Sequence, residues 1–253
     1  MGEEATGHVV LITGATSGIG ETTARLLARR GWRVFGVGHD AATPELTATL
    51  AAAAGGVVVQ ADLTGPDVPA EMVRQATERF GRLDALVNCA GIHTLATTTQ
   101  TTDEVWNRIL DVNLTAAFRL TREAIPAMVR SGGGVVVNVA SEAGIVAVPG
   151  QVAYNVSKAA MIMLTRSVAV DHAVEGIRAV SVCPGTTMTP LVRAAIDSAP
   201  DPAAHERMLA SSRPAQRLGR PEEIAAAIAF VLSDDVAYMT GSELVIDGGY
   251  TAR

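Results

Sequence analysis

Three residues in the middle of the chain could together form a proton-transfer site. Tyr154 and Lys158 lie four positions apart in the segment YNVSK, and Ser141 lies thirteen positions before the tyrosine. On a helix, residues four apart share one face, so the lysine ammonium would lie beside the phenol oxygen. A phenol has an ordinary pKa near ~10 and becomes a useful base at neutral pH only when a positive charge stabilises the phenolate. Lys158 could supply that charge, and Ser141 could supply a second hydroxyl.

The same spacing also has a purely structural interpretation. Tyrosine and lysine often occur four apart on helices, where the ring packs and the ammonium reaches water. The pair alone is therefore weak evidence of catalysis. The elements that would have to position it distinguish the two interpretations.

Short apolar runs alternate with helical patterns along the chain. The runs predicted to be strands are 9–12, 34–37, 57–59, 83–87, 135–139, 177–185 and 243–246. Helical patterns follow Gly20 and cover 68–80, 103–129, 154–174 and 222–232, and an alanine-rich segment covers 44–54. Strands that alternate with long helices indicate right-handed crossovers and a parallel sheet covered on both faces. The predicted fold is α/β, a doubly wound, Rossmann-like parallel sheet in one domain over residues 1–253.

The segment from Thr186 to Pro214 differs from the rest of the chain. It is long, polar and interrupted by prolines. A compact domain tolerates such a stretch mainly where it acts as a lid or a binding loop. We therefore expect a substrate lid around residues 186–214.

Composition excludes several classes of function. The net charge is −6 and no basic run occurs, which argues against nucleic acid and anionic membrane surfaces as partners. No apolar run reaches membrane-spanning length, and the acidic N-terminal segment does not match a signal peptide. Cys89 and Cys183 are the only cysteines, so neither a metal cluster nor a disulfide framework is indicated. A reducing cytoplasm is the expected location.

A glycine-rich turn follows the first predicted strand. In TGATSGIG, Gly14, Gly18 and Gly20 permit a tight turn and a close approach of the backbone to a diphosphate. The free N–H groups of the following helix would meet the negative charge. An ordinary strand-to-helix connection is the alternative, but the position between the first strand and the first helix favours a dinucleotide.

Several motifs together resemble the short-chain dehydrogenase/reductase family in its compact single-domain form. They are TGATSGIG, NCAG at 88–91, Asn113 in LDVNLT, Ser141, YNVSK and the Pro184-Gly185 pair. The resemblance spans nearly the whole chain and ends with RLGRPEEIA and TGSELVIDGG. It implies an oxidoreductase that transfers a hydride between NAD(P) and a secondary alcohol or ketone. It also implies a homotetramer, whose interface could use the long helices 102–129 and 151–174.

The resemblance implies a set of cofactor contacts that runs along the chain. The diphosphate and ribose side would be lined by Gly14, Ser17, Gly18, Ile19 and Gly20, the adenine by Asp62 and Leu63, and the middle by Asn88, Ala90 and Gly91. Pro184, Gly185, Thr187 and Thr189 would approach the carboxamide, beside Tyr154 and Lys158. Threonines in a surface turn are the plain alternative for this last group. Cys89 stands where the family commonly has a second asparagine, and we expect it to pack rather than react.

The choice between NAD and NADP depends on the end of the second strand, VFGVGHD. An acidic residue there binds ribose hydroxyls, and a basic one binds the extra phosphate. Gly38 occupies the usual acidic position, while His39 and Ser17 occupy positions where NADP-preferring relatives often place basic residues. Asp40 could repel a phosphate or could cap the next helix. The sequence favours NAD, with NADP as the alternative.

The resemblance also assigns roles in the chemical step. Tyr154 would be the acid/base, Lys158 would lower its pKa and hold the nicotinamide ribose, and Ser141 would hydrogen-bond the substrate oxygen. Asn113 would hold a water between Lys158 and solvent; a helix-interior amide bonded to local backbone is its alternative. No metal is expected. The substrate wall would draw on Ile145, Val146, Val148, Gln151, Met188, Leu191 and Val192.

Two other functions share parts of this pattern. A dinucleotide-binding sensor or scaffold would keep the fold without turnover. A sugar-nucleotide epimerase of the extended branch would need a larger C-terminal substrate domain. The intact set of Asn113, Ser141, Tyr154 and Lys158 favours the enzyme. The lid carries no motif that names the alcohol or the direction of the reaction.

Overall fold

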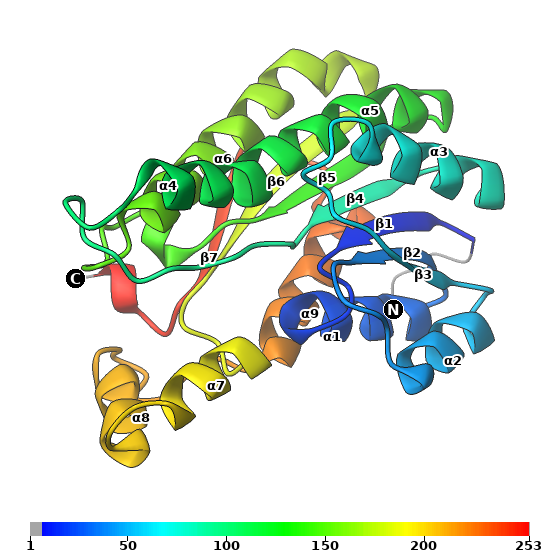
Figure 1. The fold of residues 1–253 in the computed structure, drawn as a ribbon. Coiled ribbons are helices and arrows are strands. Elements are labelled where there is room, and N and C mark those ends of the chain that lie inside the picture. Colours follow the sequence, from blue (N-terminus) through cyan, green and yellow to red (C-terminus); the bar gives the residue numbers. More distant parts are fainter. Residues whose placement is uncertain (1–6, 253) are drawn as a thin grey trace.

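The computed structural model of the chain describes residues 7–252. Most of the acidic N-terminal segment, which does not match a signal peptide, lies outside these residues. Within these residues, seven strands form one parallel sheet in the order β3-β2-β1-β4-β5-β6-β7 (Figure 1). The strands are β1 (Val9–Thr13), β2 (Arg33–Gly38), β3 (Val57–Gln60), β4 (Ala85–Asn88), β5 (Gly134–Val139), β6 (Ile177–Pro184) and β7 (Glu243–Ile246). The doubly wound fold is confirmed, with β4 shifted by one or two residues from its predicted position.

Helices cover both faces of the sheet. They are α1 (Gly18–Arg29), α2 (Pro44–Ala52), α3 (Val68–Phe80), α4 (Asp103–Leu110), α5 (Ala116–Arg130), α6 (Val152–His172), α7 (Pro190–Asp197), α8 (Pro202–Ser211) and α9 (Pro221–Val231). Helices α1, α2 and α9 share one apolar core with alternate strand residues such as Val10 and Ile12. Helices α3, α5 and α6 share the other with the intervening residues, such as Val9 and Leu11. Both faces of β1 are therefore buried, as expected for a central parallel strand.

The helix predicted over 103–129 is present and contains a π-helical turn. Helix α4 ends at Leu110, a π-helical turn η1 follows (Asp111–Thr115), and α5 begins at Ala116. Helical residues run without a gap from Asp103 to Arg130, so the predicted helix is confirmed apart from this turn. A π turn adds one residue to a helical turn and leaves the apolar pattern on either side intact, so periodicity does not reveal it. The turn carries Asn113.

The segment 186–214 contains two helices where an irregular lid was expected. Thr189 caps α7 and Asp201 caps α8, and each is followed by a proline in the first helical turn. This combination is a strong helix-start signal. Both helices project away from the sheet (Figure 1). A parallel bridge between Thr187 and Gly219 joins the two ends of the segment that carries α7 and α8. This segment therefore extends beyond Pro214.

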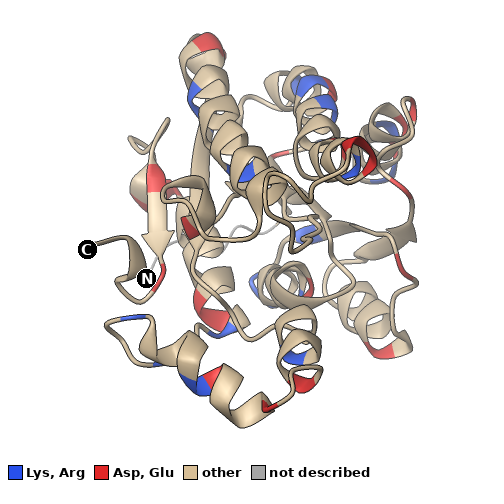
Figure 2. Ribbon diagram, turned by 60° about the vertical axis from the view of Figure 1, so that its left-hand side comes forward, with Lys and Arg blue, Asp and Glu red and all other residues tan. Residues whose placement is uncertain are grey.

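Charged residues are interspersed on the outer helices and loops (Figure 2). Within residues 7–252, no helix combines the length and the apolar character needed to cross a bilayer. In the same residues, no three His, Cys, Asp or Glu side chains converge on a point where a metal ion could bind.

Candidate active site

Ser141 and Tyr154 come together where the loop after β5 packs on α6. Strand β5 ends at Val139, and the short 3-10 helix η2 (Glu142–Gly144) begins directly after Ser141. A Cβ atom on Gly144 would lie 2.7 Å from the backbone carbon of Lys158, so only glycine permits η2 to contact α6 this closely. The hydroxyl of Ser141 also accepts a hydrogen bond from the N–H of Ala143 (3.1 Å), which fixes its position.

Tyr154 is surrounded by groups that act on its pKa in opposite directions. Burial is the largest influence and raises the pKa of the phenol, and the charge of Glu142 also raises it. A hydrogen bond with Ser141 lowers the pKa. Burial prevails, so the neutral phenol is the favoured form at neutral pH. The expected lowering by Lys158 is not found: its Nζ atom lies 5.7 Å from the centre of the Tyr154 ring.

Lys158 points to the end of β5 instead. Its ammonium donates a hydrogen bond to the carbonyl of Val139 (2.8 Å), and Lys158 as a whole residue is 3% exposed. Burial lowers the pKa of Lys158 to about 8. The ammonium lies 3.5 Å from the point that a Cβ on Gly91 would occupy. It therefore borders the NCAG loop as well as α6.

Asn113 holds the NCAG loop from the other side. Its side-chain oxygen accepts from the N–H of Ile92 (2.8 Å), and its amide nitrogen donates to the carbonyl of Ile92 (3.0 Å) and to the hydroxyl of Ser157 (3.1 Å). Both amide protons are thus used within the protein, by partners 21 and 44 positions away in the chain and not by the local backbone of the alternative interpretation. One lone pair of the oxygen is left over, because an amide oxygen accepts two bonds. A water could bind only there.

The glycine turn forms a cradle that side chains would fill. A Cβ on Gly20 would lie 2.1 Å from the carbonyl oxygen of Gly14, and one on Gly14 would lie 3.1 Å from the backbone of Ala90. Gly14 and Gly18 have φ values of +65° and +53°, a region that favours glycine. Ser17 precedes α1 and its hydroxyl makes no cap hydrogen bond. These features fit a diphosphate at the start of α1, where N–H groups are free to bind it.

The NCAG loop and the glycine turn behave as one unit. The hydroxyl of Thr13 accepts from the N–H groups of both Cys89 and Ala90, each at 3.0 Å. Burial raises the pKa of the Cys89 thiol to about 12, which keeps it protonated and fits the expected packing role.

Asn88 lies in the interior of the sheet. It is 2% exposed, and its amide nitrogen donates to Thr121 and to Asn138 on the neighbouring strand. Asn138 in turn donates to Thr165, which also accepts from Ser181. This buried ladder joins β4, β5, β6 and α6 beneath the site. Asn88 supports the sheet in this structure and presents almost no surface.

The adenosine end of the predicted site is open. Gly38 leaves no room for a side chain, because its Cβ would lie 2.2 Å from the methyl group of Thr16. The side chains of His39 and Asp40 lie 3.2 Å apart and are mostly exposed. Thr43, not Asp40, caps α2, so the capping alternative for Asp40 was wrong.

Asp62 forms a small turn beside this end. Its carboxylate accepts from the N–H and the hydroxyl of Thr64 at 3.0 and 2.7 Å, and these bonds hold its pKa below the usual range. Leu63 is half-buried between them, packed against the core of α3 and α5. Both residues are therefore held in a defined conformation.

The residues predicted to approach the carboxamide lie at the end of β6 and directly after it. The N–H of Gly185, next to Pro184, donates to the carbonyl of Ile246 on β7. The hydroxyl of Thr187 donates to the carbonyl of Gly185 (2.9 Å) and is buried. The methyl group of Thr189 lies 3.1 Å from the position of a Cβ on Gly18. The start of α7 therefore contacts the glycine turn that begins α1, where Ile19 and Gly20 follow.

Sequence reasoning missed His93. Its ring meets the Tyr154 ring edge-on, with centroids 5.1 Å apart, and its Nε2 atom hydrogen-bonds Gln151. Gln151 donates to Asn155, which donates to the carbonyl of Val148. The sequence position of His93, two residues after the NCAG motif, could have identified it as a residue near the site. Of the predicted wall, Ile145 and Leu191 are 42% and 61% exposed.

Comparison with known proteins gives a consistent result over the whole chain. A family model described as enoyl-(acyl carrier protein) reductase matches residues 14–251. An oxidoreductase of Thermotoga maritima is 42% identical over 249 residues, which cover 97% of this chain and 98% of the relative. The cis-4-hydroxycyclohexanecarboxylate dehydrogenase of Sinomonas cyclohexanicum is 39% identical over 255 residues, covering 100% of both chains. The ligand-free structure of Thermoplasma acidophilum aldohexose dehydrogenase superimposes with a TM-score of 0.89 at 32% identity, covering 98% of this chain and 95% of that one.

Proposed function

Because this chain belongs to the short-chain dehydrogenase/reductase family and is an NAD(P)-dependent oxidoreductase of alcohols and ketones, we propose that Tyr154 is the acid/base of its reaction. The observation that carries the proposal is the contact of η2 with α6. It places the hydroxyl of Ser141 within hydrogen-bonding reach of Tyr154, with the ammonium of Lys158 one helical turn away.

The proton follows a short path in this proposal. During oxidation the alcohol proton passes to the Tyr154 oxygen as the carbonyl forms, and during reduction the phenol returns a proton to the carbonyl oxygen. Ser141 donates a hydrogen bond to the substrate oxygen and stabilises the charge that develops on this oxygen. A bound nicotinamide supplies the hydride acceptor in one direction and the hydride donor in the other. Burial favours the neutral phenol, which is the form that reduction requires.

Lys158 and Asn113 have supporting roles in the proposal. Lys158 would hold the ribose hydroxyls from its position between Val139 and Gly91, and its charge would then favour the phenolate. The unused lone pair of Asn113 would bind a water that exchanges protons with Lys158. Support for this arrangement is the position of Gly91, which lies close to both side chains.

We further propose NAD as the preferred cofactor. The glycine turn, Asp62, Leu63 and the NCAG loop would bind its diphosphate and adenine side. Support for NAD over NADP comes from the exposed carboxylate of Asp40, which would repel a phosphate. Thr16 excludes a ribose-binding carboxylate at Gly38, so discrimination would fall to His39 and Asp40.

The proposed substrate is a secondary alcohol or ketone of small to medium size. The relatives named above act, by their names, on a hydroxycyclohexanecarboxylate and an aldohexose. Helices α7 and α8 would act as the substrate lid over residues 186–214. The half-exposed apolar side chains of Ile145 and Leu191 support a largely apolar wall.

Assembly and location are also proposals. A homotetramer would cover apolar side chains on α5 and α6, of which Phe118, Met163 and Val170 are 46%, 55% and 81% exposed. Light scattering coupled to size exclusion measures this mass directly. A cytoplasmic location is proposed on composition alone.

A substrate screen tests the proposed function. A panel of cyclic, linear and acidic secondary alcohols and ketones is assayed at 340 nm with both NAD(H) and NADP(H). We expect turnover with at least one pair and faster turnover with NAD(H). Tight cofactor binding without any hydride transfer would instead favour the sensor or scaffold.

A further inference from the structure

Helices α7 and α8 have few apolar contacts to hold them in place. Every residue of α8 is described and none is buried, and Ile196 is the one buried residue of α7. Leu191 and Met208 are more than half exposed. Hydrophobic burial therefore contributes little to keeping these helices against the body of the protein. Something else must fix their position.

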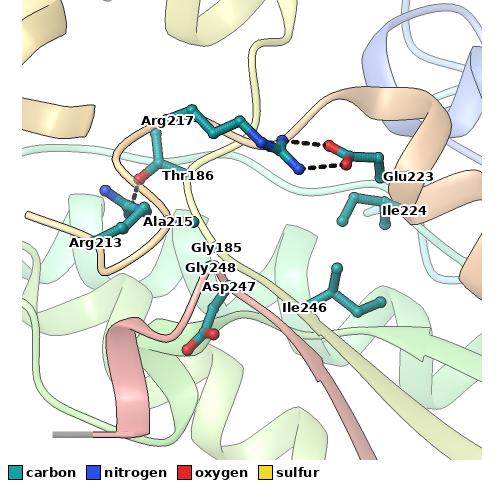
Figure 3. A pocket seen from close by; sticks show the side chains of 11 residues that line it. Gly185, Thr186, Arg213, Ala215, Arg217, Glu223, Ile224, Ile246, Asp247 and Gly248 are labelled. Carbon is teal, nitrogen blue, oxygen red and sulfur yellow. Dashed lines mark hydrogen bonds and ion pairs between the residues drawn. The ribbon is translucent and has the colours of Figure 1, made fainter. Parts of the chain in front are cut away.

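One buried guanidinium makes the connection. Arg213 follows α8 by two residues and is 3% exposed. Its Nη1 atom donates to the carbonyl of Leu209 in the last turn of α8 (2.7 Å). Its Nη2 atom donates to the hydroxyl of Thr186 at the start of the segment, as Figure 3 shows, and to the carboxylate of Glu142. Arg213 thus connects the start of the segment that carries α7 and α8 to the end of α8.

The partner carboxylate belongs to the catalytic loop. Glu142 directly follows Ser141 and opens η2, and its Oε1 atom lies 2.5 Å from Nη2 of Arg213. The side chains are 7% and 4% exposed, so water screens their attraction very little. A Cβ on Gly185 would lie 2.8 Å from the other oxygen of Glu142. The pair therefore lies directly beneath the loop that follows β6.

Neighbouring groups keep this arrangement in register. The guanidinium carbon of Arg213 lies 5.0 Å from the centre of the Tyr250 ring, and the N–H of Ala215 donates to the carbonyl of Gly248. Asp247 lines the same small cavity as Arg213 (Figure 3), and the carboxylate of Asp247 accepts from Gly249 and Thr251. Burial raises the pKa of Glu142 and the charge of Arg213 opposes this rise. Without the arginine, Glu142 would be a buried charge with no counter-ion, which is strongly unfavourable.

We propose that the buried Glu142–Arg213 ion pair anchors the lid helices α7 and α8 to the loop that carries Ser141. The two side chains are positioning residues that act through Ser141 and the lid. Since the lid would close over the substrate, this inference rests on the proposed function for its catalytic consequence. Its structural part, the anchoring of α7 and α8, is independent of any activity.

The test compares hydrogen exchange in two arginine variants of the full-length protein. Arg213→Met removes the anchor, whereas Arg217→Met removes an arginine from the same loop and the same cavity wall. Arg217 is bound to Glu223 (Figure 3) but is 57% exposed, and such surface pairs contribute little. We expect amide exchange over residues 190–211 to rise about tenfold or more in Arg213→Met and less than about twofold in Arg217→Met. Exchange in β5 and β6 should rise by less than exchange over residues 190–211 in Arg213→Met and should stay unchanged in Arg217→Met.

A second pair of variants shows whether the two residues act together. Glu142→Gln keeps the volume and one acceptor but removes the charge, so it should loosen residues 190–211 less than Arg213→Met does. In the Arg213→Met background, Glu142→Gln should loosen residues 190–211 no further and should partly reverse the effect, because the interaction is already lost and the buried charge without a counter-ion is removed. If Arg213→Met does not fold, the exchange of Glu142→Gln alone decides the question. Wild-type exchange in Arg213→Met or Glu142→Gln, or fully additive effects, would overturn the proposal.

Kinetics give the catalytic consequence separately. With a substrate from the screen, Arg213→Met should raise KM about tenfold and change the Kd of the cofactor by less, since the glycine turn that would bind the diphosphate lies between β1 and α1 and not on α7 or α8. An unchanged KM with a loosened lid would refute the coupling to substrate but leave the anchor. If wild type turns over no substrate, the proposed function fails while the exchange result still stands.

Discussion

Replacing Tyr154 with phenylalanine separates the chemical role of this residue from its structural role. The substitution removes one oxygen and keeps the ring, so the edge-on contact with His93 at 5.1 Å is retained. The hydrogen bond with Ser141 is lost, but the Ser141 hydroxyl still accepts from Ala143. The loss of one such bond lowers the free energy of unfolding by about 1 kcal/mol. For a chain of this size that is a fall in Tm of about 2–4 °C or less.

The catalytic loss should be much larger. General acid–base catalysis contributes about 10²- to 10⁴-fold, which corresponds to about 3–5 kcal/mol of transition-state stabilisation. We therefore expect kcat/KM of Tyr154→Phe to fall by at least about 100-fold, while the Kd of the cofactor changes less than about threefold. The assay is hydride transfer at 340 nm, with cofactor titration by fluorescence and a thermal melt.

Tyr238→Phe is the matched control. Tyr238 is fully exposed, so removing its hydroxyl should change neither activity nor Tm. An activity of Tyr154→Phe within tenfold of wild type would refute the assigned mechanism. Equal losses of cofactor affinity and turnover would show that the ring positions the cofactor rather than the proton.

Three further predictions concern the lysine, the cofactor end and the loop contact. Burial lowers the pKa of Lys158 to about 8 from 10.5, so the folded apoprotein binds fewer protons than the unfolded chain between these values. Wild type should therefore gain free energy of unfolding relative to Lys158→Met as the pH rises through this interval, by at most ~3 kcal/mol, and urea unfolding at several pH values would reveal a flat difference if burial were not the cause. Gly38→Asp alone should weaken NADH binding, because its Cβ would lie 2.2 Å from Thr16, whereas Thr16→Gly/Gly38→Asp should raise the preference for NADH over NADPH about tenfold in fluorescence titrations; equal behaviour of the single and double variants would contradict the steric argument. Gly144→Ala should destabilise the protein by about 1–3 kcal/mol in chemical unfolding and reduce kcat, since η2 must move off α6; wild-type values for both would remove the role assigned to this contact.

Much of the fold could be predicted because its signals are local. Buried parallel strands are short apolar runs, and the glycine turn and YNVSK lie at fixed places relative to them. A helix places Tyr154 and Lys158 one turn apart by geometry alone. The sequence also predicts which edge of the sheet holds the site, because the motifs follow the carboxyl ends of the strands.

Other features depend on contacts between distant segments. The π turn at Asn113 exists together with hydrogen bonds to Ile92, twenty-one positions earlier, and apolar periodicity does not register it. Glu142 and Arg213 are seventy-one positions apart, and in a sequence each is an ordinary charged residue expected at the surface. The bond from Lys158 to Val139 likewise follows from how α6 packs on β5. None of these has a signal within a single element.

The site therefore consists of two parts that differ in how strongly the fold holds them. Close backbone contacts at Gly14 and Gly144 hold the glycine turn and the Ser141 loop, and a side chain at either position would displace a whole element. Helices α7 and α8 bury almost nothing and depend on Arg213 for their position. Substitutions on α7 and α8 should consequently change substrate preference at little cost to the stability of the fold. Substitutions at the glycine contacts should lower stability and turnover together, so a set of variants from both regions would separate the two effects.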